Sequence, residues 1–112
     1  MSKEIKSLLV KDKWHKDFGI LSYNLEKDKF SFKYCDNVEG YEFSDINIKN
    51  GREFEQSKMF NVFMFDDSHI KNQLVINNDL SGKSENYIQW LLKEQLAETK
   101  KLSSRGFYFE KI

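Results

Sequence analysis

The chain has 112 residues, with 18 basic and 18 acidic side chains and therefore no formal net charge. Its apolar fraction of 39% is below the usual share of about 45–50%, and its charged fraction of 32% is above the usual one of about 25%. These proportions exclude collagen-like, disordered and disulfide-stapled chains, and they predict one small domain. Ten phenylalanines, five tyrosines and two tryptophans supply large side chains for its core.

Alternating polar and apolar residues dominate the chain up to residue 76. Residues 18–25 and 30–35 each alternate, and the short polar segment between them predicts a hairpin. The preceding residues, 2–14, fit either a strand or a short helix. A third strand is expected over 41–48, before Asn50-Gly51, a dipeptide suited to a tight turn. The chain then returns through Glu53 and Phe54.

Two further strands are predicted before residue 77. Segment 59–65 (MFNVFMF) is apolar on both faces, which favours a central strand, although its period also allows a short buried helix. After a polar turn at 66–68, residues 69–76 predict the next strand, with Ile70, Leu74 and Ile76 facing inward. About five antiparallel strands in so short a segment indicate a small barrel, because closure removes exposed sheet edges.

The last third of the chain changes to a helical period. Ser84 is a suitable N-cap, and apolar residues recur behind it at helical spacing, at 88, 91, 92 and 96. Lys100 and Lys101 are expected in the last turn, where cations complement the helix dipole, and Gly106 is expected to end the helix. Three consecutive aromatic residues, 107–109, then predict a terminal strand that adds to the sheet.

Four short segments, taken in chain order, resemble motifs of the cold-shock domain. Residues 16–21 (KDFGIL) resemble its first ribonucleoprotein motif, KGFGFI, and residues 30–36 (FSFKYCD) resemble its second, VFFHYSD. Residues 48–51 (IKNG) and 72–75 (NQLV) resemble its LxxG and AxNV segments. The similarity spans residues 7–76 and implies a five-stranded OB-type barrel.

The resemblance also implies a surface for single-stranded RNA or DNA. In cold-shock domains, outward aromatic side chains of both motifs stack on bases. An ungapped alignment places Ser31 and Lys33 outward and leaves Phe30 and Phe32 for the core, whereas a slip of one residue brings the two phenylalanines to the stacking face. The residues that we expect to contact nucleic acid are Trp14, Lys16, Phe18, Phe30, Phe32 and Lys33.

Charge is distributed unevenly along the chain. Residues 1–35 carry eight lysines and five acidic residues, which gives +3, whereas residues 36–68 carry three bases and eight acids, which gives −5. The remaining residues, 69–112, carry seven bases and five acids, which gives +2. The segment with the motif-like strands is therefore basic. Only Arg52 and Arg105 are arginines, so a nucleic-acid contact would rely on lysine charge rather than on the bidentate guanidinium group.

The sequence gives little indication of a metal site or of a reactive cysteine. His15 and His69 each have a carboxylate nearby, but neither shows ligand spacing typical of zinc. The single cysteine, Cys35, fits a core position and a reducing compartment, and residues 1–10 lack the apolar segment of a signal peptide. We therefore expect a cytoplasmic protein without enzymatic activity, membrane segment, metal or cofactor.

A protein-binding module is the alternative function. Tyr87, Trp90, Phe107 and Tyr108 could remain exposed beside the helix and anchor a protein partner or a second copy of the chain, since tyrosine and tryptophan are enriched in binding hot spots. The GxL hairpin followed by FxFxY also resembles the small amino-terminal subdomain of HipA-type toxin kinases. Under this hypothesis, the protein would be an accessory or inhibitor subunit of a defence or toxin–antitoxin system.

Taken together, the predicted fold is α+β. It is a single domain over residues 1–112, with a small antiparallel OB-like barrel of about five strands at 7–76. The remaining residues, 77–112, add a helix and a short terminal strand.

Overall fold

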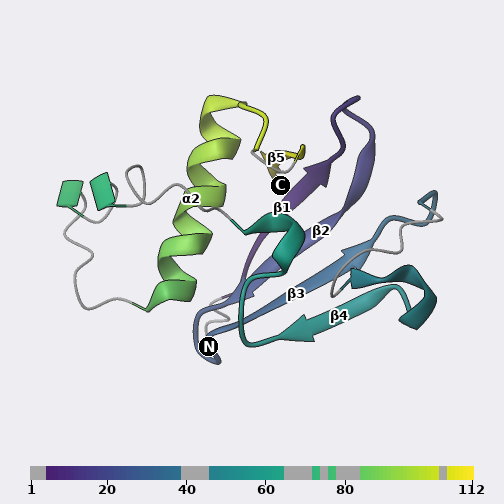
Figure 1. Cartoon of the computed structure of the whole chain (residues 1–112), viewed down its shortest axis with the longest axis horizontal. Helices are drawn as coiled ribbons and strands as arrows, with labels where there is room; N and C mark the ends of the chain where they lie inside the picture. Colours follow the sequence, from purple (N-terminus) through teal and green to yellow (C-terminus); the bar gives the residue numbers. More distant parts are fainter. Residues whose placement is uncertain (1–4, 39–45, 65–71, 74–75, 78–83, 104–105) are drawn as a thin grey trace.

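Five antiparallel strands form one sheet in the computed structural model (Figure 1). The structure describes residues 5–38, 46–64, 72–73, 76–77, 84–103 and 106–112. The strands are β1 (Ile5–Lys11), β2 (Asp17–Asn24), β3 (Lys29–Tyr34), β4 (Glu53–Gln56) and β5 (Tyr108–Lys111). Their order across the sheet is β4-β3-β2-β1-β5. The α+β class predicted from the sequence is therefore confirmed.

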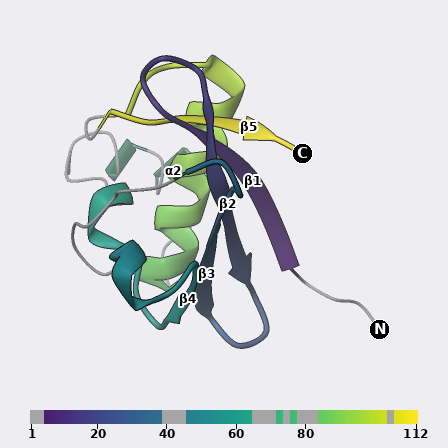
Figure 2. The ribbon, with the colours of Figure 1, turned by 90° about the vertical axis from the view of Figure 1, so that its right-hand side faces the viewer.

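An α-helix, α2 (Glu85–Thr99), and the short 3₁₀ helices η2 (Ile48–Asn50) and η3 (Asn61–Phe63) lie on the same side of the sheet (Figure 2). The face of the sheet turned toward them is the inner face, and the opposite one is the outer face. Among the described residues, no helix is long and apolar enough to cross a membrane.

The core between the inner face and the helical layer consists largely of aromatic rings. Alternate strand positions supply most of it, because successive side chains of a strand point to opposite faces. From the helical side, Trp90 and Ala97 of α2 contribute, and the segment before β5 adds Phe107. The fully or nearly fully buried strand residues are Leu8, Val10, Phe18, Leu21, Tyr23, Phe30, Phe32, Tyr34 and Phe109.

Three predicted elements are confirmed. The hairpin of β2 and β3 forms with the register Leu21 to Phe32 and Tyr23 to Phe30. Helix α2 begins behind Ser84, whose hydroxyl accepts a hydrogen bond from the backbone N–H of Tyr87. The terminal strand forms as β5 and pairs with β1. The ambiguous beginning of the chain is a strand, β1.

The end of the helix differs from the prediction. Helix α2 ends at Thr99, and Lys100 follows as the C-cap in the left-handed conformation, with φ of 58°. Its N–H donates to the carbonyl of Leu96. Gly106, expected to end the helix, lies instead in the turn before β5, where its N–H donates to the carbonyl of Ser103.

Three predicted strands are wrong where the structure describes them. Ile48 belongs to the 3₁₀ helix η2 instead of a strand over 41–48. Asn61–Phe63 is the 3₁₀ helix η3 instead of the centre of a strand over 59–65. Residues 72, 73 and 76 have helical backbone instead of the extended backbone of a strand over 69–76. The rest of these predicted strands, at 41–45, 65, 69–71 and 74–75, lies outside the described residues. Three apolar residues of segment 59–65 are buried without belonging to a strand: Met59, Phe60 and Phe63 pack in the core under the sheet.

The described strands form an open sheet rather than a closed barrel. β4 occupies one edge and β5 the other. The chain passes through α2 before β5 returns to lie beside β1. The fifth strand therefore comes from the C-terminal segment and not from residues 7–76.

Candidate functional site

The three phenylalanines expected to stack on bases are buried. Phe18, Phe30 and Phe32 expose 6%, 0% and 1% of their surface. On β3 the outward positions belong to Ser31, which is half-buried, and Lys33, which is exposed. The strand thus has the register of the ungapped alignment, and the slipped register that would bring Phe30 and Phe32 to the surface is not formed. Their rings cannot stack on a base unless the core opens.

Phe18 is turned inward by a β-bulge. In the pairing of β1 with β2, Val10 lies opposite Gly19 and Lys11 lies opposite Asp17, which leaves Phe18 as the extra residue. A bulge bends the strand and changes the direction of a side chain. The Phe18 ring consequently packs in the core, with its centroid 5.0 Å from that of Phe107 and 5.3 Å from that of Tyr34.

The turn between β1 and β2 is organised by the carboxylate of Asp12. Its Oδ1 accepts hydrogen bonds from the backbone N–H groups of Trp14, at 2.9 Å, and Lys16, at 3.0 Å. The backbone N–H of Asp12 donates to the carbonyl of Lys16, and the N–H of His15 donates to the carbonyl of Asp12. These four bonds hold the turn in one shape, as Asx side chains commonly do.

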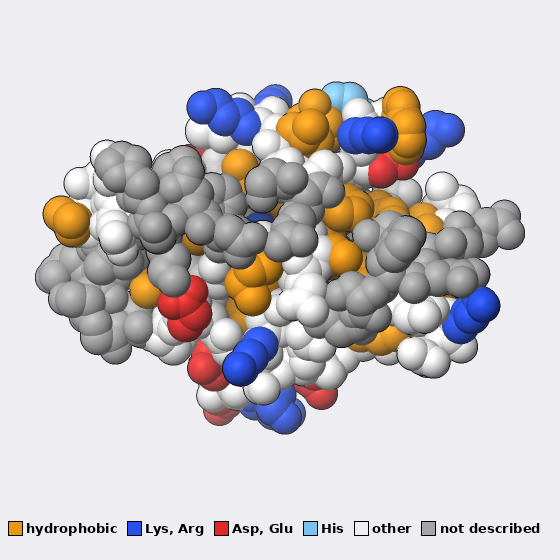
Figure 3. All heavy atoms as spheres, viewed as in Figure 1, with side chains coloured by type: hydrophobic (Ala, Val, Ile, Leu, Met, Phe, Trp, Pro, Cys, Tyr) orange, Lys and Arg blue, Asp and Glu red, His pale blue; other side chains and the backbone are white. Residues whose placement is uncertain are grey.

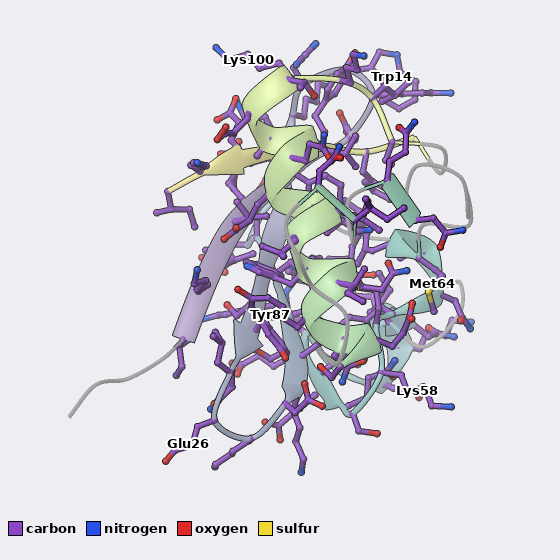
Figure 4. All side chains as sticks on the ribbon, turned by 90° about the vertical axis from the view of Figure 1, so that its left-hand side faces the viewer. Trp14, Glu26, Lys58, Met64, Tyr87 and Lys100 are labelled. Carbon is purple, nitrogen blue, oxygen red and sulfur yellow. The ribbon has the colours of Figure 1, made fainter. Side chains whose placement is uncertain are left out.

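This turn presents an exposed tryptophan between lysines. Trp14 exposes 69% of its surface, and Figure 4 shows it at the end of the sheet opposite Glu26. The ammonium group of Lys13 lies 4.7 Å from the centroid of the Trp14 ring, within cation–π range. Lys16 is exposed on the other side of the tryptophan in sequence.

A second aromatic pair lies beside the turn. The ring of His15 stacks on that of Tyr108 in β5, with centroids 4.2 Å apart and ring planes 18° apart. His15 has a φ of 64°, the left-handed conformation that glycine and asparagine adopt more easily. Hydrophobic, basic and histidine side chains gather at this end of the molecule in Figure 3. We call the group Lys13, Trp14, His15, Lys16 and Tyr108 the tip.

Of the residues predicted to contact nucleic acid, the structure brings Trp14 and Lys16 together in the tip. It places Lys33 elsewhere, on the outer face, beside Ile20 of β2 and Glu53 of β4. A shallow hollow of about 490 Å³ lies there. The sequence analysis did not include Lys13 or His15 among the binding residues, although the run of lysines around Trp14 was a usable signal.

The residues of the alternative partner surface are mostly buried. Trp90 has no exposed surface, and its indole N–H donates to the carboxylate of Glu94 at 2.9 Å. Phe107 exposes 6%, and Tyr87 is half-buried against the core. Tyr108 alone of these four reaches the tip, as the partner of His15.

The remaining candidate side chains are Cys35 and His69. Cys35 is half-buried, and burial raises the pKa of its thiol, with a smaller contribution from Asp17. His69 lies outside the described residues. Within the part of the chain that the structure describes, no three histidine, cysteine or acidic side chains are grouped so that they could hold a metal ion.

No protein-family model matches the sequence, and a comparison with curated proteins finds no significantly similar one. The functional proposal below therefore depends on the chemistry of the tip.

Proposed function

We propose that the protein is a non-catalytic single-stranded nucleic-acid-binding protein of the cytoplasm, and that the tip is its binding surface. The observation that supports this proposal most directly is the exposed Trp14 on a hydrogen-bonded turn between two lysines. Aromatic faces bind unpaired bases by stacking, and nearby lysines neutralise phosphates. The proposal keeps the function implied by the cold-shock resemblance and retains Trp14 and Lys16, but it replaces the buried phenylalanines with other residues of the tip.

The tip has a backbone held by hydrogen bonds and an exposed aromatic ring. The Asp12 hydrogen bonds hold the turn before any ligand arrives, so little conformational entropy remains to be lost on binding. His15 keeps a backbone conformation that costs a residue with a side chain about 1 kcal/mol or more. Its ring and that of Tyr108 form a second flat surface next to the turn, suitable for a neighbouring base.

The charge of the tip favours a polyanion. Lys13 and Lys16 are exposed there, whereas the carboxylate of Asp12 is engaged by backbone N–H groups. Two or three phosphate contacts imply a modest salt dependence, with a slope of log affinity against log salt near −2 for a single strand. Binding should therefore be clear at low salt and weak at high salt.

The test is fluorescence anisotropy of a labelled 15-nucleotide oligo(U) or oligo(dT) across a salt series. The change Trp14→Ala should weaken binding roughly fivefold to hundredfold, the equivalent of about 1–3 kcal/mol for one stacked base. The double change Lys13→Ala with Lys16→Ala should weaken binding and flatten the salt slope by about 1.4, which is about 0.7 for each lost phosphate contact with a single strand. Because these side chains are exposed, the melting temperature should stay unchanged.

Lys27→Ala is the matched control, because Lys27 is an exposed lysine in the β2–β3 turn at the other end of the sheet. It should leave affinity nearly unchanged. The proposal fails if the wild-type protein does not bind either oligonucleotide at about 50 mM salt. It also fails if Trp14→Ala binds as tightly as the wild type.

A further inference from the structure

The outer face of the sheet carries an apolar ridge next to a hollow. Leu9 and Ile20 lie opposite each other on β1 and β2, and we call this pair the ridge; Leu9 is half-buried, and Ile20 exposes 37% of its surface. The hollow of about 490 Å³ begins at Ile20 and is bordered by side chains of β2, β3 and β4. Two of them, Ser22 and Ser31, are paired across the strands and are too small to fill it.

Charged groups of both signs border this hollow. Lys33 lies opposite Glu53 in the pairing of β3 with β4, and Glu55 lies opposite Ser31. Within the part of the chain that the structure describes, none of the three charged side chains has a hydrogen bond or an ion pair. At the other side of the outer face, by contrast, Lys11 and Glu110 form an ion pair of 3.1 Å.

We infer that two copies of the chain associate through their outer faces around a two-fold axis. The Leu9–Ile20 ridge of each copy would occupy the hollow of the other, and Lys33 of each would face Glu53 and Glu55 of the other. A two-fold interface brings the same patch of both copies together, so the patch must complement itself. This face does so, because the ridge, the hollow and both signs of charge lie side by side on it.

A second copy fits this face better than a strongly charged partner. The three charges at the hollow are one positive and two negative, and Lys11 with Glu110 adds a neutral pair, so neither a polyanion nor a polycation is favoured. The face spans roughly 24 by 26 Å, from five strands about 4.8 Å apart and the eight residues of β2. That is near the lower limit for a specific interface, so the dimer should dissociate in the micromolar range.

Sedimentation velocity between about 1 and 200 μM protein tests the interface, and this range brackets a micromolar dissociation constant. The wild type should shift from monomer to dimer. Lys33→Glu should raise the dissociation constant at least about tenfold, because it places three negative side chains against three others. The double change Glu53→Lys with Glu55→Lys should do the same. An equimolar mixture of the two variants should recover dimers, since opposite charges then meet.

Lys27→Glu is the control for Lys33→Glu, because it makes the same charge change away from the outer face, in the β2–β3 turn. It should dimerise like the wild type. Ser31→Tyr, which fills the hollow without adding charge, should abolish the dimer if the ridge enters there. The inference is overturned if the wild type stays monomeric throughout, if Lys33→Glu and Lys27→Glu behave alike, or if the mixture of charge variants remains monomeric.

Oligonucleotide binding gives an independent readout, because Lys13, Trp14 and Lys16 of the tip lie in the β1–β2 turn, whereas Lys33 lies on β3. Lys33→Glu should keep the affinity of the wild type for oligo(U) while losing the dimer. If Lys33→Glu instead loses oligonucleotide binding and the wild type never dimerises, the outer face is a nucleic-acid surface and the dimer is excluded.

Discussion

Gly19 shows how a single residue permits the packing of this sheet. It lies on the inner side of β2, opposite Tyr34 of β3. The Phe32 ring covers it so closely that a Cβ atom at position 19 would stand 2.3 Å from Phe32 Cζ and 2.7 Å from the carbonyl oxygen of Lys33. Glycine is needed here because of the close approach of a ring and a neighbouring backbone. The bulge at Phe18 immediately precedes this contact.

We expect Gly19→Ala to lower the free energy of unfolding by about 1–3 kcal/mol or more, since the ring and the strand must move apart. Urea denaturation followed by circular dichroism measures this change. Ile20→Ala is the control, because Ile20 is the next residue of the strand and points to the outer face. Equal stability of Gly19→Ala and wild type would show that Phe32 does not cover position 19.

At the scale of elements, Asp28 connects the β2–β3 turn to the start of helix α2 through hydrogen bonds. The hydroxyl of Tyr23 donates to its carboxylate, and the Ser84 hydroxyl donates to the same oxygen at 3.2 Å. The side-chain amide of Asn86 donates to the carbonyl of Asp28 at 3.0 Å and to that of Ser57 at 2.6 Å. The hairpin, the start of α2 and the segment after β4 therefore meet at one point. Burial, followed by the bond to Asp28, raises the pKa of Tyr23 to about 12.

This pKa predicts a loss of stability in strong base. The unfolded chain ionises Tyr23 near pH 10, whereas the folded chain keeps it neutral up to about 12. Since the raised pKa favours the neutral phenol in the folded state, its contribution is complete below pH 10 and is lost as the pH rises toward 12. Urea denaturation of wild type and Tyr23→Phe between pH 8 and 11.5 should show a steeper decline for the wild type. Parallel curves would contradict a raised pKa in the folded protein.

At the scale of the whole molecule, the end of the chain completes the sheet that its beginning starts. β5 pairs with β1 from Leu8 opposite Lys111 to Lys11 opposite Tyr108. Phe109 of β5 and the preceding Phe107 are both buried in the core. The last strand also supplies Tyr108 to the tip, so the sheet and the proposed binding surface both depend on a contact between residues about 100 positions apart.

Removal of residues 107–112 should therefore unfold the chain. Each of the two buried phenylalanines contributes about 3–5 kcal/mol, and together they approach the whole stability of a small domain, about 5–15 kcal/mol. We expect the shortened chain to lose cooperative thermal unfolding in circular dichroism. The control is a chain that lacks Lys111 and Ile112 alone. Because both residues are exposed, this chain should stay folded. Cooperative unfolding of the shorter chain near the wild-type temperature would show that β5 is dispensable.

Local patterns were sufficient for the elements whose stabilising contacts are close in sequence. The alternation around Leu21 and Phe32 predicted the β2–β3 hairpin, because both strands bury one face and are joined by a short turn. The cap at Ser84 predicted the start of α2, because its hydroxyl bonds to a backbone N–H three residues ahead. Trp14 and Lys16, expected to bind nucleic acid on the cold-shock resemblance, are both exposed, and their binding role remains a prediction.

Where distant contacts decide the structure, the predictions were wrong or incomplete. The apolar side chains of segment 59–64 serve the core, where Met59, Phe60 and Phe63 pack under the sheet. Apolar content alone does not distinguish a strand from the 3₁₀ helix that forms here. The cold-shock resemblance implied that Phe18 faces outward, but the bulge between β1 and β2 adds a residue and turns Phe18 inward. The stacking of His15 on Tyr108 requires β5 beside β1, and no local pattern contains that pairing.

By itself the sequence determined the α+β class, the β2–β3 hairpin, the helix after Ser84 and the aromatic content of the core, because these follow from periodicity, capping and composition. Tertiary structure alone decided that the sheet is open, that its fifth strand is the C-terminal one, and that Phe30 and Phe32 lie inside while Lys33 lies outside. The physical reason is that a shift of one residue in register exchanges the two faces of a strand, and the register depends on which face the helix and the distant β5 segment cover.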